Sequence, residues 1–260
     1  MALPKTKNKH AISPMFSMGF LMRNVDEKNV KLPGKALIIY ANSVEELFVK
    51  ELGLQRIPEL EKAIVNYNTL SIYESKALPN LMVVRLAIGA PLTAMISEDL
   101  IRLGVKEFLI VGEAGGIRQD LAPGNLVVCT KAVRDVGTSE HYLKGGMYAR
   151  ADKSLTKKIE VLMKKSGIPS ITGPTWSIDA PYTETREEVE RFSKLGVLTV
   201  EMESAGLFAV AYKRGVKACA VFIVSDVLRL DSGWSGFDSG ESYSKGFAML
   251  PKVAKAFAEA

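Results

Sequence analysis

Short apolar runs alternate with amphipathic stretches along the chain, from about residue 36 to its end. Most of these runs are rich in Val and Ile and almost continuously hydrophobic. Such runs are typical of strands that are covered on both faces, as in a mainly parallel sheet. The sequence predicts strands at residues 36–41, 81–88, 108–112, 126–133, 197–200 and 218–224.

Between these runs, apolar residues recur at helical spacing. In residues 92–103, for example, the side chains of Leu92, Ile96 and Leu103 fall on one face of a helix. Helices are predicted at residues 44–52, 92–103, 153–165, 185–193, 202–214 and 243–258. Because strands and helices alternate, we predict an α/β fold: a single domain with a central, mixed, mostly parallel sheet flanked by helices. We expect residues 1–30 to form an irregular N-terminal extension and residues 31–260 to form the domain.

The amino-acid composition excludes several classes of protein and of binding partner. The chain has 260 residues, of which 47% are hydrophobic and 24% charged, so a disordered chain and a coiled coil are excluded. No apolar run is long enough for a spanning helix, and no signal peptide is recognisable, so we expect a cytoplasmic protein with no membrane partner. The net charge of +5 is not concentrated in a basic block, so a nucleic-acid partner is not expected.

Three predicted strands end in residues that can carry chemistry. The first, residues 110–116, reads Ile-Val-Gly-Glu-Ala-Gly-Gly and places Glu113 among glycines. Glycines at the carboxyl end of a parallel strand let a ligand approach the backbone, although a purely structural turn explains them equally well. The pattern lacks the glycine spacing of a dinucleotide fingerprint and the Lys of a phosphate-binding P-loop.

The second segment places two acids, Glu201 and Glu203, on either side of Met202 at the start of a predicted helix. Acidic residues are stabilised at a helix N-terminus by the helix macrodipole, but a single acidic residue would be enough to explain the pattern in that way. Two carboxylates together also suit a polyhydroxyl ligand such as ribose, whose neighbouring hydroxyls donate hydrogen bonds to them.

The third segment ends a strand with Ser225 and Asp226. This pair could cap the following segment, or it could place an acid at the mouth of the sheet. The chain's two histidines, His10 and His141, do not form a ligand set at metal-binding spacing, so neither a metal nor another cofactor is predicted. We interpret His141 as a loop residue.

Taken together, these segments resemble the nucleoside phosphorylase superfamily, which includes purine nucleoside and uridine phosphorylases and the methylthioadenosine/S-adenosylhomocysteine nucleosidases. Residues 200–206, Val-Glu-Met-Glu-Ser-Ala-Gly, carry the most specific motif, and the resemblance covers about residues 36–230. It implies a nucleoside phosphorylase-like fold and a small-molecule nucleoside as partner. It also implies a homo-oligomer, either a hexamer built as three dimers or a dimer.

The resemblance also implies roles for individual residues. Glu203 would hold the ribose hydroxyls, with Met202 beside the sugar and Glu201 in support. Asp226, aided by Ser225, would act at N7 of a purine. The remaining substrate contacts implied are Tyr182 and Trp176 at the base, Gly112, Ala114 and Gly115 in the glycine turn, and His10 reaching into a neighbouring subunit's ribose pocket.

The chain departs from the phosphorylases where they bind phosphate. Glu45 and Ile110 replace two arginines, and Glu113 replaces a hydroxyl residue. The chain also departs from the nucleosidases, because Tyr40 stands where their loop has a glycine. A carboxylate about 5 Å from a phosphate charge costs about 3 kcal/mol per pair of unit charges at an effective dielectric constant of about 20. By resemblance to the nucleosidases, Glu45 would instead activate water, and Glu113 would tune it.

We therefore expect cleavage of the N-glycosidic bond of a purine nucleoside, with hydrolysis favoured. Two alternatives stay open. One is a purine nucleoside or uridine phosphorylase with an unconventional phosphate site. The other is a non-catalytic nucleoside-binding protein that has kept Glu203 and Asp226.

Overall fold

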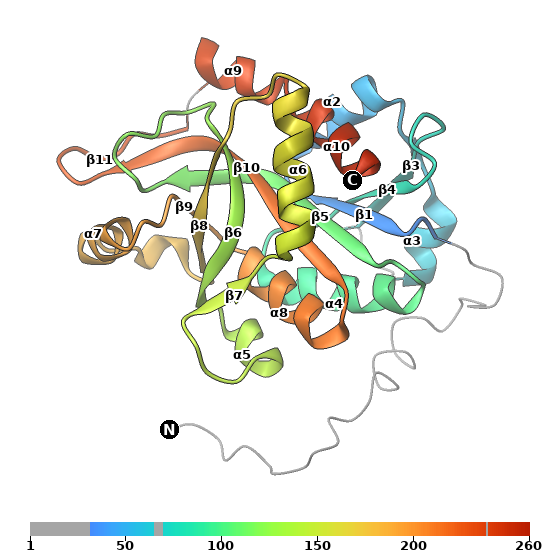
Figure 1. Ribbon diagram of the computed structural model, residues 1–260, viewed down its shortest axis with the longest axis horizontal. Helices are drawn as coiled ribbons and strands as arrows, with labels where there is room; N and C mark the ends of the chain where they lie inside the picture. The colour runs from blue at the N-terminus through green and yellow to red at the C-terminus, as the bar shows by residue number, and fades with distance from the viewer. Residues whose placement is uncertain (1–31, 65–69, 238) are drawn as a thin grey trace.

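The computed structural model describes residues 32–64, 70–237 and 239–260, which form a mixed sheet with helices on both faces (Figure 1). The predicted α/β class is confirmed. The predicted N-terminal extension lies outside the described residues. The strands are β1 (Lys35–Ile39), β2 (Gln55–Arg56), β3 (Ser71–Glu74), β4 (Leu81–Arg85), β5 (Glu107–Gly116), β6 (Leu126–Asp135), β7 (Tyr148–Arg150), β8 (Ile171–Ile178), β9 (Thr199–Glu201), β10 (Lys217–Arg229) and β11 (Gly233–Trp234).

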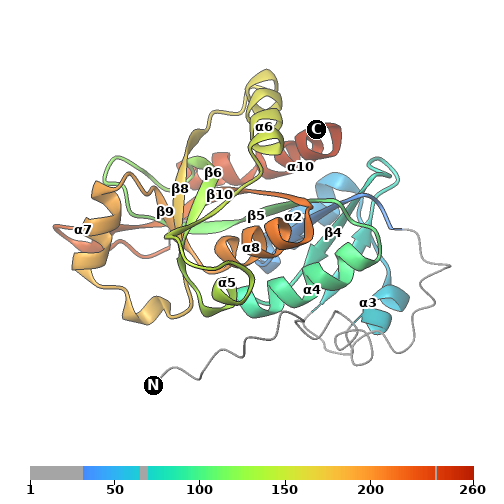
Figure 2. The same cartoon turned by 60° about the horizontal axis from the view of Figure 1, so that its bottom comes forward.

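The helices form two layers. Figure 2 shows α6 and α10 on one side of the sheet and α4, α5 and α8 on the other. Each layer buries its own apolar cluster against the sheet, which is why the strands are hydrophobic on both faces. The helices are α2 (Asn42–Leu52), α3 (Pro58–Ile64), α4 (Ala90–Arg102), α5 (Gly137–Tyr142), α6 (Lys153–Lys165), α7 (Arg186–Lys194), α8 (Ser204–Arg214), α9 (Glu241–Phe247) and α10 (Leu250–Glu259), with a 3-10 turn η1 at Pro181–Thr183.

The sheet closes partly on itself. Its strand order is β11-β10-β6-β8-β9-β5-β1-β4-β3-β2, and β10 also pairs with β5. Strands β10, β6, β8, β9 and β5 therefore form a closed ring, and β1, β4, β3 and β2 extend from β5 as an open sheet. Parallel pairings join β1 to β4 and β5, β5 to β10, and β8 to β6 and β9.

Strand β5 has two partners along one edge. Strand β1 pairs with its first part, as far as Ile110, and β9 pairs with Gly115 and Gly116 at its end. Residues 111–114 of β5 lie between these two partners. The sheet is therefore open along this edge of β5, near the carboxyl ends of β1 and β5. The glycines expected to form a turn, Gly112, Gly115 and Gly116, continue β5 as strand; the name glycine turn is kept below for residues 112–116 of β5.

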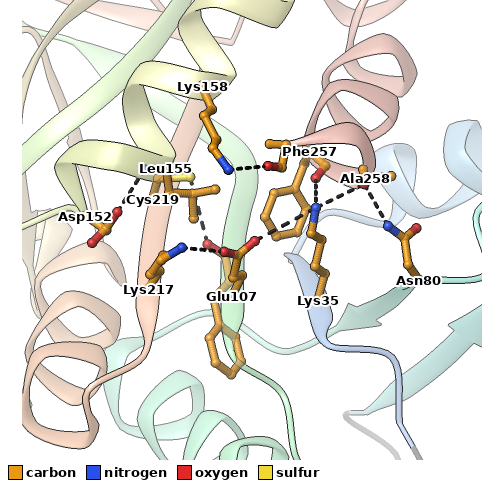
Figure 3. Close-up of polar contacts among 12 residues, drawn as sticks. Lys35, Asn80, Glu107, Asp152, Leu155, Lys158, Lys217, Cys219, Phe257 and Ala258 are labelled. Atoms are coloured by element: carbon orange, nitrogen blue, oxygen red, sulfur yellow. Dashed lines mark hydrogen bonds and ion pairs between the residues drawn. The ribbon is translucent and has the colours of Figure 1, made fainter.

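At the opposite end of the parallel strands, polar contacts anchor the C-terminal helix (Figure 3). The Lys35 ammonium donates to the carbonyl oxygens of Phe257 and Ala258, both at 3.0 Å. Glu107 accepts a hydrogen bond from Lys217 at 2.8 Å and lies 3.9 Å from the Lys35 ammonium. This end of the sheet therefore carries a charged structural cluster, remote from the glycine turn.

The predicted elements differ from the observed ones in three instructive places. The helix predicted at 243–258 is divided into α9 and α10, with Pro251 in the first turn of α10, where it needs no hydrogen-bond donor. Strand β8 was not predicted because Gly173 and Pro174 interrupt its apolar pattern. His141 lies in the short helix α5 and not in a loop, which corrects that interpretation.

Within the described ranges, no helix has the length and apolar character needed to cross a membrane.

Candidate active site

A cavity of about 570 Å³ lies where strands β1, β5, β9 and β10 converge. Its wall includes Tyr40 after β1, Glu113 on β5, Glu203 after β9 and Asp226 on β10. The volume is typical of small-molecule sites. The three segments that the sequence singled out are thus brought together at one cavity.

Glu201 is a supporting residue within this wall. Its Oε2 accepts hydrogen bonds from the backbone N–H groups of Glu203, at 2.9 Å, and Ser204, at 2.8 Å. Its Oε1 accepts one from the Ser177 hydroxyl. These bonds satisfy donors at the start of α8 that would otherwise lack partners. They hold the backbone of the motif in place, and so they fix the direction in which Glu203 points.

Glu203 is only 6% exposed, yet its carboxyl group lines the cavity. Oε1 accepts a hydrogen bond from the Gly89 N–H at 2.6 Å, and Oε2 accepts one from the Met202 N–H at 3.3 Å. Burial and the neighbouring Glu201 charge raise the pKa of Glu203 to about 8. The raised pKa favours the protonated form of Glu203, which can both donate and accept hydrogen bonds.

Asp226 owes its position to an irregularity in β10. The pairing with β5 shifts register between Val224 and Asp226, which is the signature of a bulge and turns the Ser-Asp pair toward the cavity. Asp226 Oδ1 accepts a hydrogen bond from the Ser225 hydroxyl at 2.6 Å, and Oδ2 accepts one from the Trp234 indole N–H at 2.7 Å. A side chain at Gly115 would sit 3.3 Å from Oδ2, so glycine keeps this approach open.

Tyr40 lies beside Gly112, where the resemblance places phosphate. A Cβ atom at Gly112 would lie 3.7 Å from Cδ2 of the Tyr40 ring. The Tyr40 hydroxyl and Oγ1 of Thr93 are joined by a hydrogen bond of 2.9 Å. Burial, together with the Glu203 charge, raises the pKa of Tyr40 well above its ordinary value, so the phenol stays neutral. An aromatic ring therefore packs beside the glycine turn.

Two further acids have different surroundings. Glu113 lines the cavity and accepts a hydrogen bond from the Tyr243 hydroxyl of α9. Glu45, on α2, is not among the residues of the cavity wall. Its carboxylate accepts a hydrogen bond from the Tyr73 hydroxyl and lies 3.7 Å from the Arg85 guanidinium.

The structure brings most of the predicted substrate residues to the cavity and leaves a few away from it. His10 lies outside the described residues, and Gly112 and Glu45 are not on the cavity wall. Those on the wall are Glu113, Ala114, Gly115, Tyr182, Glu201, Met202, Glu203, Ser225 and Asp226.

The expectation that Trp176 contacts the base needs correction. Its side chain is 0% exposed and packs against Phe192, with ring centroids 4.7 Å apart. Its indole N–H donates to Asp135 at 3.0 Å. Ile178, two positions nearer the end of β8, reaches the cavity instead.

Sequence reasoning missed several wall residues, among them Glu184, Trp234 and Phe237. Glu184 follows the turn η1, and the two aromatic residues lie in the Gly- and Ser-rich segment after β10. Trp234 is 58% exposed and Phe237 is 78% exposed. Two large aromatic side chains close together in so polar a segment were the available signal, because contiguous exposed apolar groups can mark a binding site.

Comparison with known proteins extends these observations. A sequence model of the phosphorylase superfamily matches residues 41–258, which is most of the chain. The chain belongs to the phosphorylase superfamily. The resemblance noted from the sequence motifs is thereby confirmed, and the residues of the cavity wall lie within the matched region except for Tyr40.

Relatives of this phosphorylase-superfamily chain carry phosphorylase names. A guanosine phosphorylase of Halorubrum lacusprofundi is 32% identical over 168 residues, 65% of this chain and 66% of the relative. A DeoD-type purine nucleoside phosphorylase of Shewanella amazonensis is 35% identical over 143 residues, 54% of this chain and 61% of the relative. Another of that type, from an Exiguobacterium species, is 27% identical over 203 residues, 77% of this chain and 81% of the relative. The chain thus spans just under two thirds of the first two relatives.

Proposed function

We propose that this member of the phosphorylase superfamily cleaves the N-glycosidic bond of a purine nucleoside, with water as the nucleophile. The observation that carries the choice of water is the position of Tyr40, whose ring packs beside Gly112. Glu113 faces the cavity next to it. A phosphate ion needs open space beside the backbone and positive charge around it. In this proposal the Tyr40 ring takes up that space, and the Glu113 carboxylate stands where positive charge would be needed.

The sugar and the base are held by separate groups in this proposal. Glu203 binds the ribose hydroxyls, and Asp226 lies at N7 of the purine. The bond between C1′ and N9 breaks, its electron pair goes to the base, and Asp226 places a proton on N7. The ribosyl cation that develops is stabilised by the surrounding carboxyl groups. Water then bonds to C1′ and its proton passes to Glu113. Glu113 releases that proton to solvent and Asp226 regains one from solvent, so a nucleoside and water give free base and ribose.

The proton of water goes to Glu113 in this proposal and not to Glu45. Glu113 lies on the cavity wall, whereas Glu45 is outside it and engaged by Tyr73 and Arg85. A general base must reach the proton that it removes, directly or through one water molecule. Glu45 therefore takes no part in the proton transfer in this proposal.

Electrostatics support water over phosphate. At about 5 Å and an effective dielectric constant of about 20, the Glu113 charge opposes a phosphate dianion by about 6 kcal/mol. That is about four orders of magnitude in affinity at 25 °C. Water carries no charge and escapes this penalty.

Phosphorolysis is the second candidate, because the relatives are named phosphorylases. The substitutions Glu113→Gln and Glu45→Gln test which carboxylate receives the proton of the attacking water. If Glu113 receives the proton, Glu113→Gln lowers turnover by about 100-fold or more and leaves nucleoside binding intact in calorimetry. Glu45→Gln, the matched control, has a smaller effect. Full activity of Glu113→Gln would refute this assignment, and binding without turnover by the unmodified protein would favour a non-catalytic role.

A further inference from the structure

The hydroxyl of Tyr243, in α9, contacts Glu113 from outside the cavity. It donates a hydrogen bond to Oε1 of Glu113, whereas Tyr243 itself is not among the residues of the cavity wall. The second oxygen, Oε2, has no hydrogen-bond or ion-pair partner among the residues that the structure describes. The protein therefore holds one oxygen of this carboxylate and leaves the other for a group in the cavity.

The direction in which Glu113 leaves β5 explains why its partner comes from α9. Side chains alternate across a strand, so Glu113 lies on the same face of β5 as Leu109 and Val111. These two residues belong to the apolar cluster that α6 and α10 cover, and the Tyr243 ring packs against the same cluster. A carboxylate on an apolar face needs a polar partner, and the phenol supplies one.

Close contacts fix the position of α9. A Cβ atom at Gly246 would lie 2.2 Å from the carbonyl oxygen of Gly124, so this approach requires glycine. The Ser242 hydroxyl donates a hydrogen bond to the carbonyl oxygen of Pro123 at 2.9 Å. Both contacts join α9 to the loop before β6. The phenol of Tyr243 therefore has a defined place behind the cavity wall.

We propose that Tyr243 is a positioning residue for the proton transfer to Glu113: its hydroxyl holds Oε1 and so directs Oε2 toward the attacking water. This inference rests on the proposed function. A base that a third group orients is more effective, because its lone pair already points at the proton to be moved. Tyr243 keeps its own proton, since burial and then the hydrogen bond to Glu113 raise the pKa of the phenol. No bond of Tyr243 is made or broken in the reaction.

Tyr243→Phe removes the hydroxyl and keeps the ring, which stacks on Phe247 with centroids 5.6 Å apart. We expect kcat for a purine nucleoside to fall about 10-fold, because a misaligned base is less effective, while KM changes little. Tyr73→Phe is the matched control. It removes the same kind of hydrogen bond from Glu45 and should leave kcat unchanged. An unchanged kcat in Tyr243→Phe, or equal losses in the two variants, would overturn the inference.

A double-mutant cycle separates positioning from a purely structural role. In the Glu113→Gln background, Tyr243→Phe should cause no further loss of kcat, because the carboxylate that the hydroxyl positions is gone. Losses that multiply would show that the hydroxyl acts through a group other than Glu113, and they would refute the assignment.

NMR of the protein labelled with carbon-13 at tyrosine Cζ tests the contact without turnover. Glu113→Gln should shift the Tyr243 resonance, which Tyr243→Phe identifies, and Glu45→Gln should shift that of Tyr73 instead. A Tyr243 resonance that Glu113→Gln leaves in place would overturn the inference. Hydrolysis that proceeds unchanged in Tyr243→Phe refutes the inference alone, whereas cleavage by the native protein that depends on phosphate refutes the proposed function and the inference with it.

Discussion

The Tyr40 hydroxyl is hydrogen-bonded to Oγ1 of Thr93 at 2.9 Å, which ties the end of β1 to the helix α4. The same ring packs beside Gly112 of β5. The contact therefore fixes an aromatic side chain beside the glycine turn. Because Thr93 is fully buried, its hydroxyl depends on this partner.

Tyr40→Phe should lower the free energy of unfolding by about 1–2 kcal/mol, because it leaves the buried Thr93 hydroxyl without its partner. The ring stays in place, so turnover should remain independent of phosphate. Urea denaturation measures the first effect. Tyr212→Phe, at a residue that is 78% exposed, is the control and should change stability little. Equal effects of the two substitutions would show that the bond contributes nothing.

Glu203→Gln should retain the fold and lose most turnover, by about 100-fold or more, because the amide cannot take up the charge that stabilises the ribosyl cation. Steady-state kinetics with guanosine or inosine provide the measurement. Near-normal activity would contradict the role of Glu203 at the sugar.

Glu203 should also make stability depend on pH. Its pKa is about 8 in the folded protein against an ordinary value of 4.5, so the folded state binds the proton more tightly than the unfolded state. Stability attributable to Glu203 is therefore complete at low pH and is lost as pH rises from about 5 through 8. Asp99 and Glu184, whose pKa values are each raised to about 7, add slopes of the same sign. Glu203→Gln should flatten the curve while those slopes remain; an identical curve would contradict the raised pKa.

Asp226→Asn should slow cleavage of guanosine by about 100-fold or more, because proton transfer to N7 is lost. It should slow cleavage of 7-methylguanosine far less, since that base already carries a positive charge at N7 and leaves without protonation. The ratio of the two rates is the informative quantity. Equal losses on both substrates would assign Asp226 a structural role only.

A homo-oligomer remains a prediction of the superfamily resemblance. The mouth of the cavity carries exposed apolar side chains at Ile88, Tyr182 and Phe237, which are 67%, 103% and 78% exposed in a single chain. Such exposed apolar groups typically mark interaction sites. Light scattering at micromolar concentration should give the mass of a dimer or a hexamer, and the mass of a monomer would contradict the prediction.

The sequence predicted the parts of the site that depend on local pattern. Glu113, Glu203 and Asp226 each follow an apolar run, and the carboxyl ends of parallel strands such as β5 and β10 meet at a common edge. It could not predict that β9 runs antiparallel to β5, nor the partners that tertiary packing supplies. Tyr73, which holds Glu45, comes from β3, and Tyr243, which holds Glu113, comes from α9.

Strand β8 illustrates a second limit. A Cβ atom at Gly173 would come within 2.6 Å of Leu198, so the close packing there requires glycine. Glycine also weakens the sequence pattern from which a strand is predicted. Trp176 therefore could not be recognised as a core residue, and Glu184, beyond the end of that strand, was overlooked. The fold class nevertheless followed from the remaining runs, because their hydrophobicity on both faces requires helices on both sides of the sheet.

The central claim is that water attacks at the ribose C1′. The most direct measurement is the identity of the sugar product when the protein cleaves guanosine with and without inorganic phosphate, in water enriched in oxygen-18. We predict free ribose that carries the heavy oxygen at C1′, formed at the same rate in both conditions. Formation of ribose 1-phosphate at a rate that rises with phosphate concentration would contradict the claim and identify the protein as a phosphorylase.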